Sequence, residues 1–287
     1  MSELAFVIEI AVRIVTSALW LALAALGLAI IFGVMGVINL AHGALLTIGA
    51  YMAWQVTSLG FNLAIGFVVA FVVVAVVGYV IEKSVIRFLY DRPLDTLLAT
   101  WGFSLVIEEL IKIVFGTRSR TVSNPFPGSW DVLGATIPRY RVVLSLIAIG
   151  ALLFSYALFK YTKFGVKSRA VIQNEEMASQ LGVNVNRIYT MTFMYGAGIA
   201  GLAGAAMAPM VSVEPQTGLL FLVQSFFVVI IGGTGHILLG TAGGAAIVGG
   251  LRSLISSFGP ETFAFAAVFT IAMIIIRFRP RGLFGGR

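Results

Sequence analysis

The sequence predicts an all-α integral membrane protein, a polytopic bundle of about eight to ten transmembrane helices with glycine-broken central helices. The composition is the first reason, since 59% of the residues are hydrophobic and 11% are charged, which excludes a soluble globular domain. The second is a run of 68 residues between Arg13 and Glu82 without Asp, Glu, Lys or Arg, enough for about three crossings of roughly 20 residues. The third is the clustering of glycine inside apolar segments. Residues 1–287 are predicted to form a single transmembrane domain.

The apolar runs predict nine membrane spans, within that range of eight to ten. They lie at residues 12–32, 36–57, 62–81, 94–115, 142–159, 188–209, 219–234, 237–257 and 261–277. The chain has no cysteine and only two histidines, which are 194 positions apart. No catalytic residue and no metal site is therefore predicted. In the span at 188–209, the four-residue spacing of Gly196, Ala200 and Gly204 predicts a closely packed helix.

The most unusual segment is the charged insert at residues 160–187, KYTKFGVKSRAVIQNEEMASQLGVNVNR. Its pattern predicts a helix from about Ser168 to Leu181, with Gly182 as its C-cap. One stripe of this helix would hold Ala170, Val171, Asn174, Met177, Ala178 and Leu181, surrounded by charged side chains that include Arg169, Glu175 and Glu176. We interpret the stripe as a docking face for a soluble partner. The alternative is a surface helix in an ordinary basic loop.

Placing the insert in the cytoplasm sets the orientation. Of the 19 Lys and Arg residues, 12 then lie on the cytoplasmic side and 7 outside, a modest agreement with the positive-inside rule. The net charge of +7 therefore indicates a lipid bilayer as partner, not nucleic acid. The N-terminus and the loop at 116–141 would be periplasmic. That loop carries four arginines against Asp131, which suits either docking of an acidic protein or contact with lipid headgroups.

The segment from Gly33 to Tyr51 places Asn39 and His42 at bilayer depth, among several glycines. Buried polar side chains in a membrane are costly unless they face a cavity or another helix, and glycine allows the helix to break. We therefore predict a discontinuous helix lining a solute path. The alternative is that Asn39 caps the start of an ordinary span and His42 is hydrogen-bonded in its first turn.

A second apolar segment in the other half of the chain, residues 230–255, is likewise interrupted by glycines. Gly232, Gly233, Thr234 and Gly235 stand near its start. Glycine-broken hydrophobic segments in both halves are the best sequence indication of a transporter's central site. These four residues are therefore predicted to line the same path.

Three runs in chain order resemble one family. They are GLAIIFGVMGVINLAHGALLTIGAY, KSRAVIQNEEMASQLGVNVNRI and EPQTGLLFLVQSFFVVIIGGTGHILLGTAGGAAIVGG. Together they resemble the permease subunits of branched-chain amino acid (hydrophobic amino acid uptake) ABC importers, of the type carrying the N-x-A-H-G motif. Asn39, Ala41, His42 and Gly43 match that motif, which lines the translocation path in the family. Glu176, Ala178 and Gly182 match the loop that contacts the ATPase, and Arg169, Glu175 and Leu181 lie beside them.

The resemblance implies a heteromeric complex in the bacterial inner membrane. Its parts would be this multi-pass permease, a second permease, two cytoplasmic ATPases that hold ATP and Mg, and a periplasmic substrate-binding protein. Whether the second permease is a paralogous chain or another copy of this one stays open. The chain itself would need no cofactor.

The sequence departs from the family pattern at positions that bear on the solute. Ala44 stands where the family often has Glu, and Gln224 stands where it often has Lys. The run from Gly235 to Gly240 also lacks the usual Gly-Ser-x-x-Gly. The implied solute is a branched-chain or other amino acid, with urea, short amides and aromatic carboxylates as alternatives.

The source of energy follows from a missing motif. The sequence has no G-x-x-x-x-G-K-[ST], so the chain is predicted to be no enzyme and to depend on partner ATPases for inward transport by alternating access. The alternative is a secondary transporter driven by an ion gradient. Its acids would be Glu108 and Glu109, but Lys112 lies one turn after Glu108 and favours a local ion pair.

Overall fold

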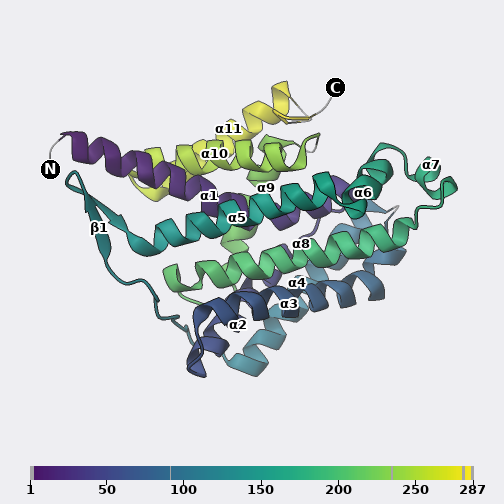
Figure 1. The fold of residues 1–287 in the computed structure, drawn as a ribbon, viewed down its shortest axis with the longest axis horizontal. Coiled ribbons are helices and arrows are strands. Elements are labelled where there is room, and N and C mark those ends of the chain that lie inside the picture. The colour runs from purple at the N-terminus through teal and green to yellow at the C-terminus, as the bar shows by residue number, and fades with distance from the viewer. Residues whose placement is uncertain (1–2, 91, 234, 280–281, 286–287) are drawn as a thin grey trace.

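The computed structural model describes residues 3–90, 92–233, 235–279 and 282–285. Within these ranges the fold consists of nine long helices, two short helices and one hairpin (Figure 1). The helices are α1 (Glu3–Met35), α2 (His42–Ser58), α3 (Leu63–Ser84), α4 (Pro93–Phe115), α5 (Arg139–Tyr161), α6 (Lys163–Gln173), α7 (Glu175–Gln180), α8 (Val185–Met207), α9 (Thr217–Gly232), α10 (Ile237–Ser256) and α11 (Glu261–Phe278). Strands β1 (Ser129–Val132) and β2 (Ala135–Pro138) pair antiparallel, and short 3-10 turns lie at Ile86–Phe88 and Ala208–Met210.

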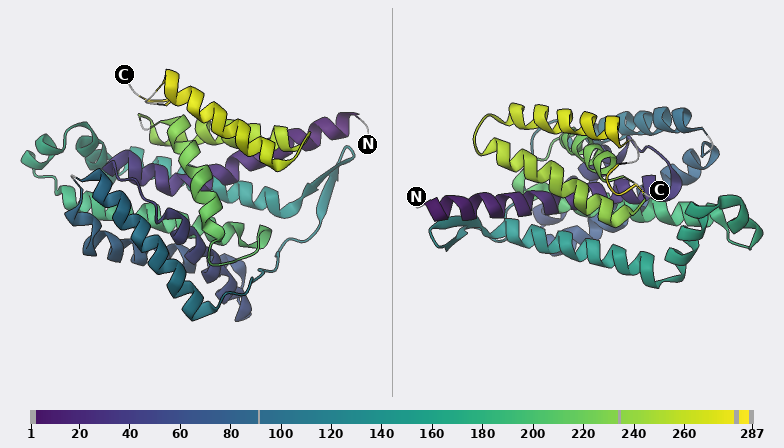
Figure 2. Two further views of the ribbon diagram at one scale, coloured as in Figure 1. Left: turned by 180° about the vertical axis from the view of Figure 1, so that it is seen from behind. Right: turned by 90° about the horizontal axis from the view of Figure 1, so that it is seen from above.

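The molecule has two distinct ends. The N-terminus and β1 lie at one end, called the hairpin end below, and α7 lies at the other, called the α7 end (Figure 1). Most long helices run between these ends, whereas α9 crosses the bundle steeply (Figure 2). Helices α1 and α10 are antiparallel, because Gly33 lies against Ile237 while Gly249 lies against Ala18.

Helix α8 occupies the centre, in contact with α1, α2 and α3. Small residues make these contacts possible. A Cβ atom on Gly204 would lie 1.9 Å from the carbonyl oxygen of Leu46 in α2, and one on Gly196 would lie 2.6 Å from the Ile31 side chain in α1. The predicted close packing of this helix is confirmed.

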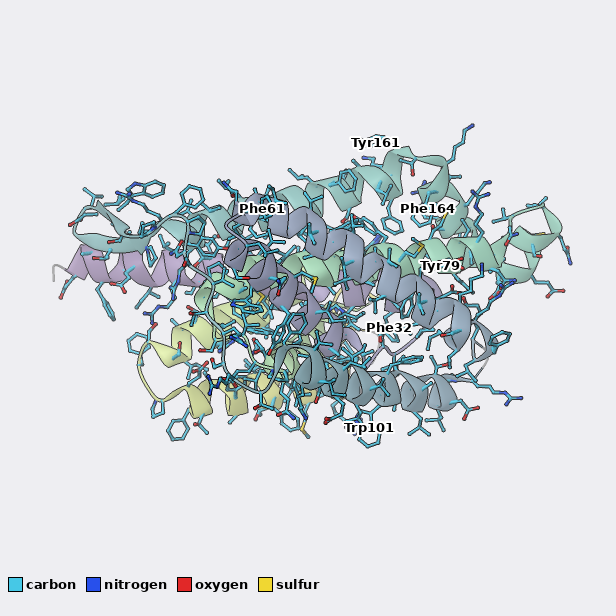
Figure 3. All side chains as sticks on the ribbon, turned by 90° about the horizontal axis from the view of Figure 1, so that it is seen from below. Phe32, Phe61, Tyr79, Trp101, Tyr161 and Phe164 are labelled. Carbon is cyan, nitrogen blue, oxygen red and sulfur yellow. The ribbon has the colours of Figure 1, made fainter. Side chains whose placement is uncertain are left out.

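The outer surface of the bundle is apolar. Trp101 of α4, Phe61 before α3 and Tyr161 at the end of α5 are exposed on the outside (Figure 3). Six helices of the described part of the chain are long and apolar enough to cross a membrane, namely α1, α3, α5, α8, α10 and α11. Helix α9 is apolar but has only 16 residues. The chain is therefore an all-α, multi-pass membrane protein.

The predicted spans correspond to the nine long helices with two differences. Helix α1 begins at Glu3 instead of residue 12, and α2 begins at His42 instead of residue 36. The second difference has a clear cause, since Gly36 has a φ of +68° and ends α1. Residues 36–41, called the buried turn below, are not helical.

Candidate functional site

The buried turn is held by side-chain hydrogen bonds. The Asn39 Oδ1 atom accepts from the Ala41 backbone N–H at 3.1 Å. Thr100 of α4 reaches across to the same turn, where its hydroxyl accepts from the Leu40 N–H at 3.1 Å and lies 3.3 Å from the Ile38 carbonyl oxygen. The backbone groups that a continuous helix would have paired are thus partly satisfied by two side chains.

His42 fixes the start of α2 against α1. Its Nε2 atom lies 2.8 Å from the carbonyl oxygen of Ala24, and because a carbonyl only accepts, Nε2 carries the hydrogen. Asn39, Ala41 and His42 are fully buried, and a Cβ atom on Gly43 would lie 2.9 Å from the Gly218 carbonyl oxygen of α9. The structure therefore brings the four residues of the N-x-A-H-G motif together between α1, α4 and α9.

Two polar atoms of this group have no partner among the described residues. They are the Nδ2 atom of Asn39 and the Nδ1 atom of His42, both buried. The alternative stated above agrees with His42, which is hydrogen-bonded at the first residue of α2, but not with Asn39 as a cap, because the N-cap of α2 is Ala41. In this conformation neither side chain reaches solvent.

The second glycine-rich segment lies at the α7 end. Gly233 has a φ of +77° and ends α9, while Gly235 is exposed. Thr234 lies outside the described residues. A Cβ atom on Gly232 would lie 2.0 Å from the Gly240 carbonyl oxygen, so α9 and α10 touch here. Among the described residues no hydrogen bond joins this segment to Asn39 or His42.

Residues near the C-terminus pack against this segment, a contact that the sequence did not predict. The backbone N–H groups of Leu283 and Phe284 donate to the carbonyl oxygens of Ile231 and Gly232, both at 2.9 Å. These carbonyls belong to the last turn of α9, which leaves them without helical partners. The one available signal was the apolar pair Leu283-Phe284 within a basic tail.

The predicted helix from Ser168 to Leu181 is wrong, because the structure has two helices that meet at Asn174. This residue is extended, with φ −160° and ψ 104°, and its Oδ1 atom accepts from the Met177 N–H at 2.8 Å. Asn174 is therefore the N-cap of α7. Gly182, predicted as the C-cap, lies one residue beyond the C-cap Leu181. It has a φ of +83°, and the Val183 N–H donates to the Ala178 carbonyl oxygen at 3.0 Å, as is usual where glycine ends a helix.

The predicted apolar stripe is also divided. Val171 and Ala178 are buried against the bundle, whereas Met177 and Leu181 are exposed. The reason is the change of helix direction at Asn174, which ends the periodicity on which the stripe depended.

The predicted coupling residues have different surroundings. Arg169 donates to the Phe159 carbonyl oxygen at the end of α5. Glu175 accepts from the Tyr189 hydroxyl of α8 at 2.9 Å. Glu176 is exposed and makes no hydrogen bond with the rest of the described chain. Of these three side chains, only that of Glu176 makes no hydrogen bond within the described chain.

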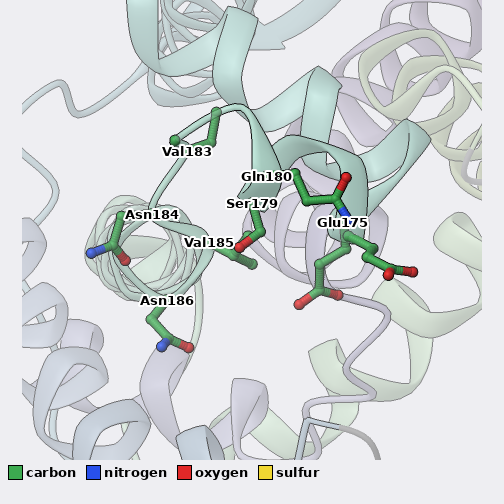
Figure 4. Close-up of a pocket in the computed structure, with 9 residues that line it drawn as sticks. Glu175, Ser179, Gln180, Val183, Asn184, Val185 and Asn186 are labelled. Atoms are coloured by element: carbon green, nitrogen blue, oxygen red, sulfur yellow. The ribbon is translucent and has the colours of Figure 1, made fainter.

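A groove of about 840 Å³ lies beside α7 (Figure 4). We call it the α7 groove. Its lining residues, both polar and apolar, are Glu175, Glu176, Ser179, Gln180, Gly182, Val183, Asn184, Val185 and Asn186.

A buried acid near the same end escaped the sequence reading. Glu82 of α3 is fully buried, and its Oε1 atom accepts from the Tyr90 hydroxyl. The Tyr90 ring lies edge-on to the Tyr189 ring at 4.8 Å, and Tyr189 in turn donates to Glu175. Burial, together with the Glu82 carboxyl group, raises the pKa of Tyr90 far above its usual range. These four side chains connect α3 to α7.

Of the two acids that a secondary transporter would need, Glu109 forms an ion pair at the surface of the protein. Lys112 contacts Glu109 at 2.7 Å, and the Glu109 side chain is 66% exposed. The expected ion pair thus forms, but with Glu109 instead of Glu108. No group of His, Asp or Glu in the described ranges could hold a metal ion.

Fold and site define a polytopic helical membrane protein with a buried polar turn and a projecting helix at one end. The chain belongs to the family "Branched-chain amino acid transport system / permease component", which matches residues 10–277. It is 27% identical to the high-affinity branched-chain amino acid transport system permease protein LivH of Escherichia coli K12, over 92% of this chain and 91% of that protein.

Two further relatives cover the chain equally well. The permease protein BraD of a high-affinity branched-chain amino acid transport system in Pseudomonas aeruginosa is 25% identical, over 92% of this chain and 91% of BraD. A probable branched-chain amino acid transport permease protein LivH of Methanocaldococcus jannaschii is 29% identical, over 92% and 88%. The chain has no match among solved structures.

Proposed function

We propose that this chain is the permease subunit of an ATP-driven ABC importer that moves an amino acid inward by alternating access. The family match over residues 10–277 supports transport. The observation that supports ATP-driven coupling is the exposed Glu176 on a short helix that is anchored to the bundle at Ala178 and Glu175. A helix held in this way transmits a displacement to the bundle.

In this proposal the α7 end faces the bacterial cytoplasm. Ten Lys and Arg residues of the described chain gather on this side, which agrees with the positive-inside rule. They are Lys83, Arg87, Arg92, Lys160, Lys163, Lys167, Arg169, Arg187, Arg277 and Arg279. Two ATPase subunits, which hold ATP and Mg, would contact α7 and the α7 groove. A second permease would share the membrane, and a substrate-binding protein would dock at the hairpin end.

The solute would pass between α2 and α9. Here their backbones are in close contact at Gly43 and Gly218, so this conformation is closed at that level. Separation of the two helices would expose Asn39 and His42, whose buried and unpartnered nitrogen atoms would then meet solute or water. Gly232, Gly233 and Gly235 would lie near the cytoplasmic exit.

The first test is the charge reversal Glu176→Lys. We expect the variant to reach the membrane and its partners to hydrolyse ATP, while uptake falls by about tenfold or more, since breaking a buried interfacial charge pair costs about 2–5 kcal/mol. The measurement is uptake and ATP hydrolysis by the same complex in liposomes.

Lys167→Glu is the matched control, because Lys167 is exposed on α6 and does not line the α7 groove. It should retain the normal ratio of uptake to hydrolysis. Near-normal uptake by the Glu176→Lys complex would count decisively against a coupling role for α7.

A second test separates the two nitrogen atoms of His42. In the variant His42→Gln, the amide N–H can still donate to the Ala24 carbonyl oxygen, but the Nδ1 atom is gone. We expect a folded complex with uptake reduced about tenfold, the value of about one lost hydrogen bond. Normal uptake by a stable His42→Gln complex would remove Nδ1 from the solute path.

A further inference from the structure

A second cavity, of about 600 Å³, lies at the hairpin end. Its walls come from α1, α5, α8, α9, α10 and α11, and its volume is within the roughly 300–1,000 Å³ of small-molecule sites. Because three arginines line it, we call it the arginine cavity. Gln224, which the sequence comparison singled out as a departure from the family pattern, also lines it, whereas none of the residues predicted to line the solute path or to contact the ATPase does.

The three arginines come from parts of the chain far apart in sequence. They are Arg13 of α1, Arg141 of α5 and Arg252 of α10, and one acid, Glu261, lines the same cavity. All three arginines are half-buried. Three guanidinium groups against one carboxylate give the lining an excess of positive charge, which favours an anionic group.

Not all of this charge is neutralised within the protein. Arg252 donates to the Gln224 Oε1 atom at 2.7 Å and contacts Glu261. The Arg141 guanidinium makes no hydrogen bond with the described residues. Arg13 forms an ion pair with Glu9 at 3.9 Å, a separation too long for a hydrogen bond. Arg141 and Arg13 therefore retain donors for a carboxylate, which arginine binds through two parallel N–H groups.

A buried hydroxyl adds a further polar group. Ser253 lines the arginine cavity and is 3% exposed, and its Oγ atom has no hydrogen-bond partner among the described residues. Buried polar groups are normally paired. The hydroxyl and the free guanidinium donors therefore point to a polar ligand.

The remaining wall is apolar and aromatic. Trp20 and Phe221 meet edge to face at 5.8 Å, and Arg252 lies over the Phe265 ring at 4.9 Å. Leu21, Leu144, Leu220, Met207, Met210 and Val211 complete this wall. A ligand that fits both parts has a carboxylate at one end and an apolar group at the other.

We infer that the arginine cavity is an entry site for a zwitterionic amino acid with an apolar side chain. Arg141 and Arg13 would bind the carboxylate, Glu261 the ammonium group, and the wall at Trp20 and Phe221 the side chain. The inference rests on the proposed function in taking an amino acid as the ligand. The cavity's charge and lining support a carboxylate-bearing amphiphile independently of ATP-driven transport.

The position of the cavity agrees with an entry site. Met207, Val211 and Phe221 also line a much smaller gap of about 10 Å³, together with Thr47 and Gly218. There the Thr47 hydroxyl accepts from the Gly218 N–H at 3.0 Å. The arginine cavity thus adjoins the closed contact between α2 and α9, on its hairpin side.

The test is binding of radiolabelled L-leucine to the full-length permease, purified with its co-purifying subunits and placed in phosphatidylcholine nanodiscs. The substrate-binding protein is left out. We expect saturable binding of leucine. Leucinol, which lacks the carboxylate, and 4-methylpentanoate, which lacks the ammonium group, should each compete at least tenfold more weakly than unlabelled leucine does. Arg141→Gln should weaken leucine binding about 10- to 100-fold, the value of a hydrogen bond to a charged group.

Arg141→Gln is the informative variant because it removes no hydrogen bond within the described protein. Arg139→Gln is its matched control, since Arg139 lies two residues away and packs over Trp130 at 6.0 Å, outside the cavity. The control should bind leucine as the parent does. A second variant, Arg13→Gln, should weaken binding in the same direction.

Two results would overturn the inference. One is leucine binding unchanged in the folded Arg141→Gln and Arg13→Gln variants. The other is tightly held phosphatidylglycerol, detected in the purified protein by mass spectrometry and not displaced by leucine, which would assign the arginines to a lipid headgroup. Arginine-dependent leucine binding with no ATP-dependent uptake would support this site while contradicting the proposed function.

Discussion

Gly204→Ala is expected to destabilise the folded permease strongly, although it adds only one methyl group. The added Cβ atom would lie 1.9 Å from the Leu46 carbonyl oxygen and 2.7 Å from its carbonyl carbon. Both atoms are backbone, so α2 and α8 must separate. Overpacking of a core costs about 1–3 kcal/mol, and here the separation also disturbs the start of α2. The measurement is the midpoint of thermal unfolding and the yield of monodisperse protein in detergent.

The same substitution at Gly102 provides the control. Gly102 lies in α4, and an added Cβ atom there would meet no atom within 4 Å. Alanine is favoured over glycine in a helix by about 1 kcal/mol, so Gly102→Ala should leave the midpoint unchanged or raise it. If both variants unfolded at the same temperature, the close contact between α2 and α8 would be contradicted.

The helices of this fold were largely predictable because the bilayer imposes a length and a polarity on each span. Glycine spacing also identified α8 as a tightly packed helix, since residues four apart share one face. The start of α2 was not predictable in the same way. Residues 36–41 are almost as apolar as a span, and one of the two side chains that hold the turn, Thr100, lies about 60 positions away in the sequence.

The candidate sites were predictable to different degrees. Asn39 and His42 stood out because polar residues are rare at bilayer depth. The arginine cavity was invisible, since Arg13, Arg141 and Arg252 lie more than 100 positions apart and meet only through packing. The break at Asn174 was missed because the predicted stripe used only the polarity of the side chains. The Asn174 side chain instead accepts a hydrogen bond from a backbone N–H, and such local bonds compete with a continuous helix.

The link between Glu82 and Tyr90 gives the second large effect. Removal of the phenol hydroxyl in Tyr90→Phe leaves the fully buried Glu82 without its donor, and the second oxygen of Glu82 already has no partner among the described residues. A buried polar group left unpaired costs about 1–3 kcal/mol, and more if charged. We expect a loss of this size, measured as the shift in urea midpoint of the reconstituted protein.

The pH dependence should change with it. The pKa of Tyr90 is raised in the folded protein, so its contribution to stability is complete below the unfolded tyrosine pKa of about 10 and is lost as the pH rises above it. The parent protein should therefore lose stability more steeply above about pH 10 than Tyr90→Phe does. Equal slopes would show that Tyr90 does not hold its proton more tightly in the folded state.

A double variant separates the lost hydrogen bond from the lost packing. Replacing both partners, as in Glu82→Leu with Tyr90→Phe, removes the buried carboxyl group together with its donor, and such paired replacement is often nearly neutral. The double variant should therefore be more stable than Tyr90→Phe alone.

Tyr189→Phe adds the functional comparison, since it removes the hydrogen bond to Glu175 but leaves Glu82 with Tyr90. If α7 drives the bundle through these side chains, Tyr189→Phe should lower uptake per ATP hydrolysed with less loss of stability than Tyr90→Phe. Unchanged coupling in that variant would place the transmission elsewhere, at the buried Ala178.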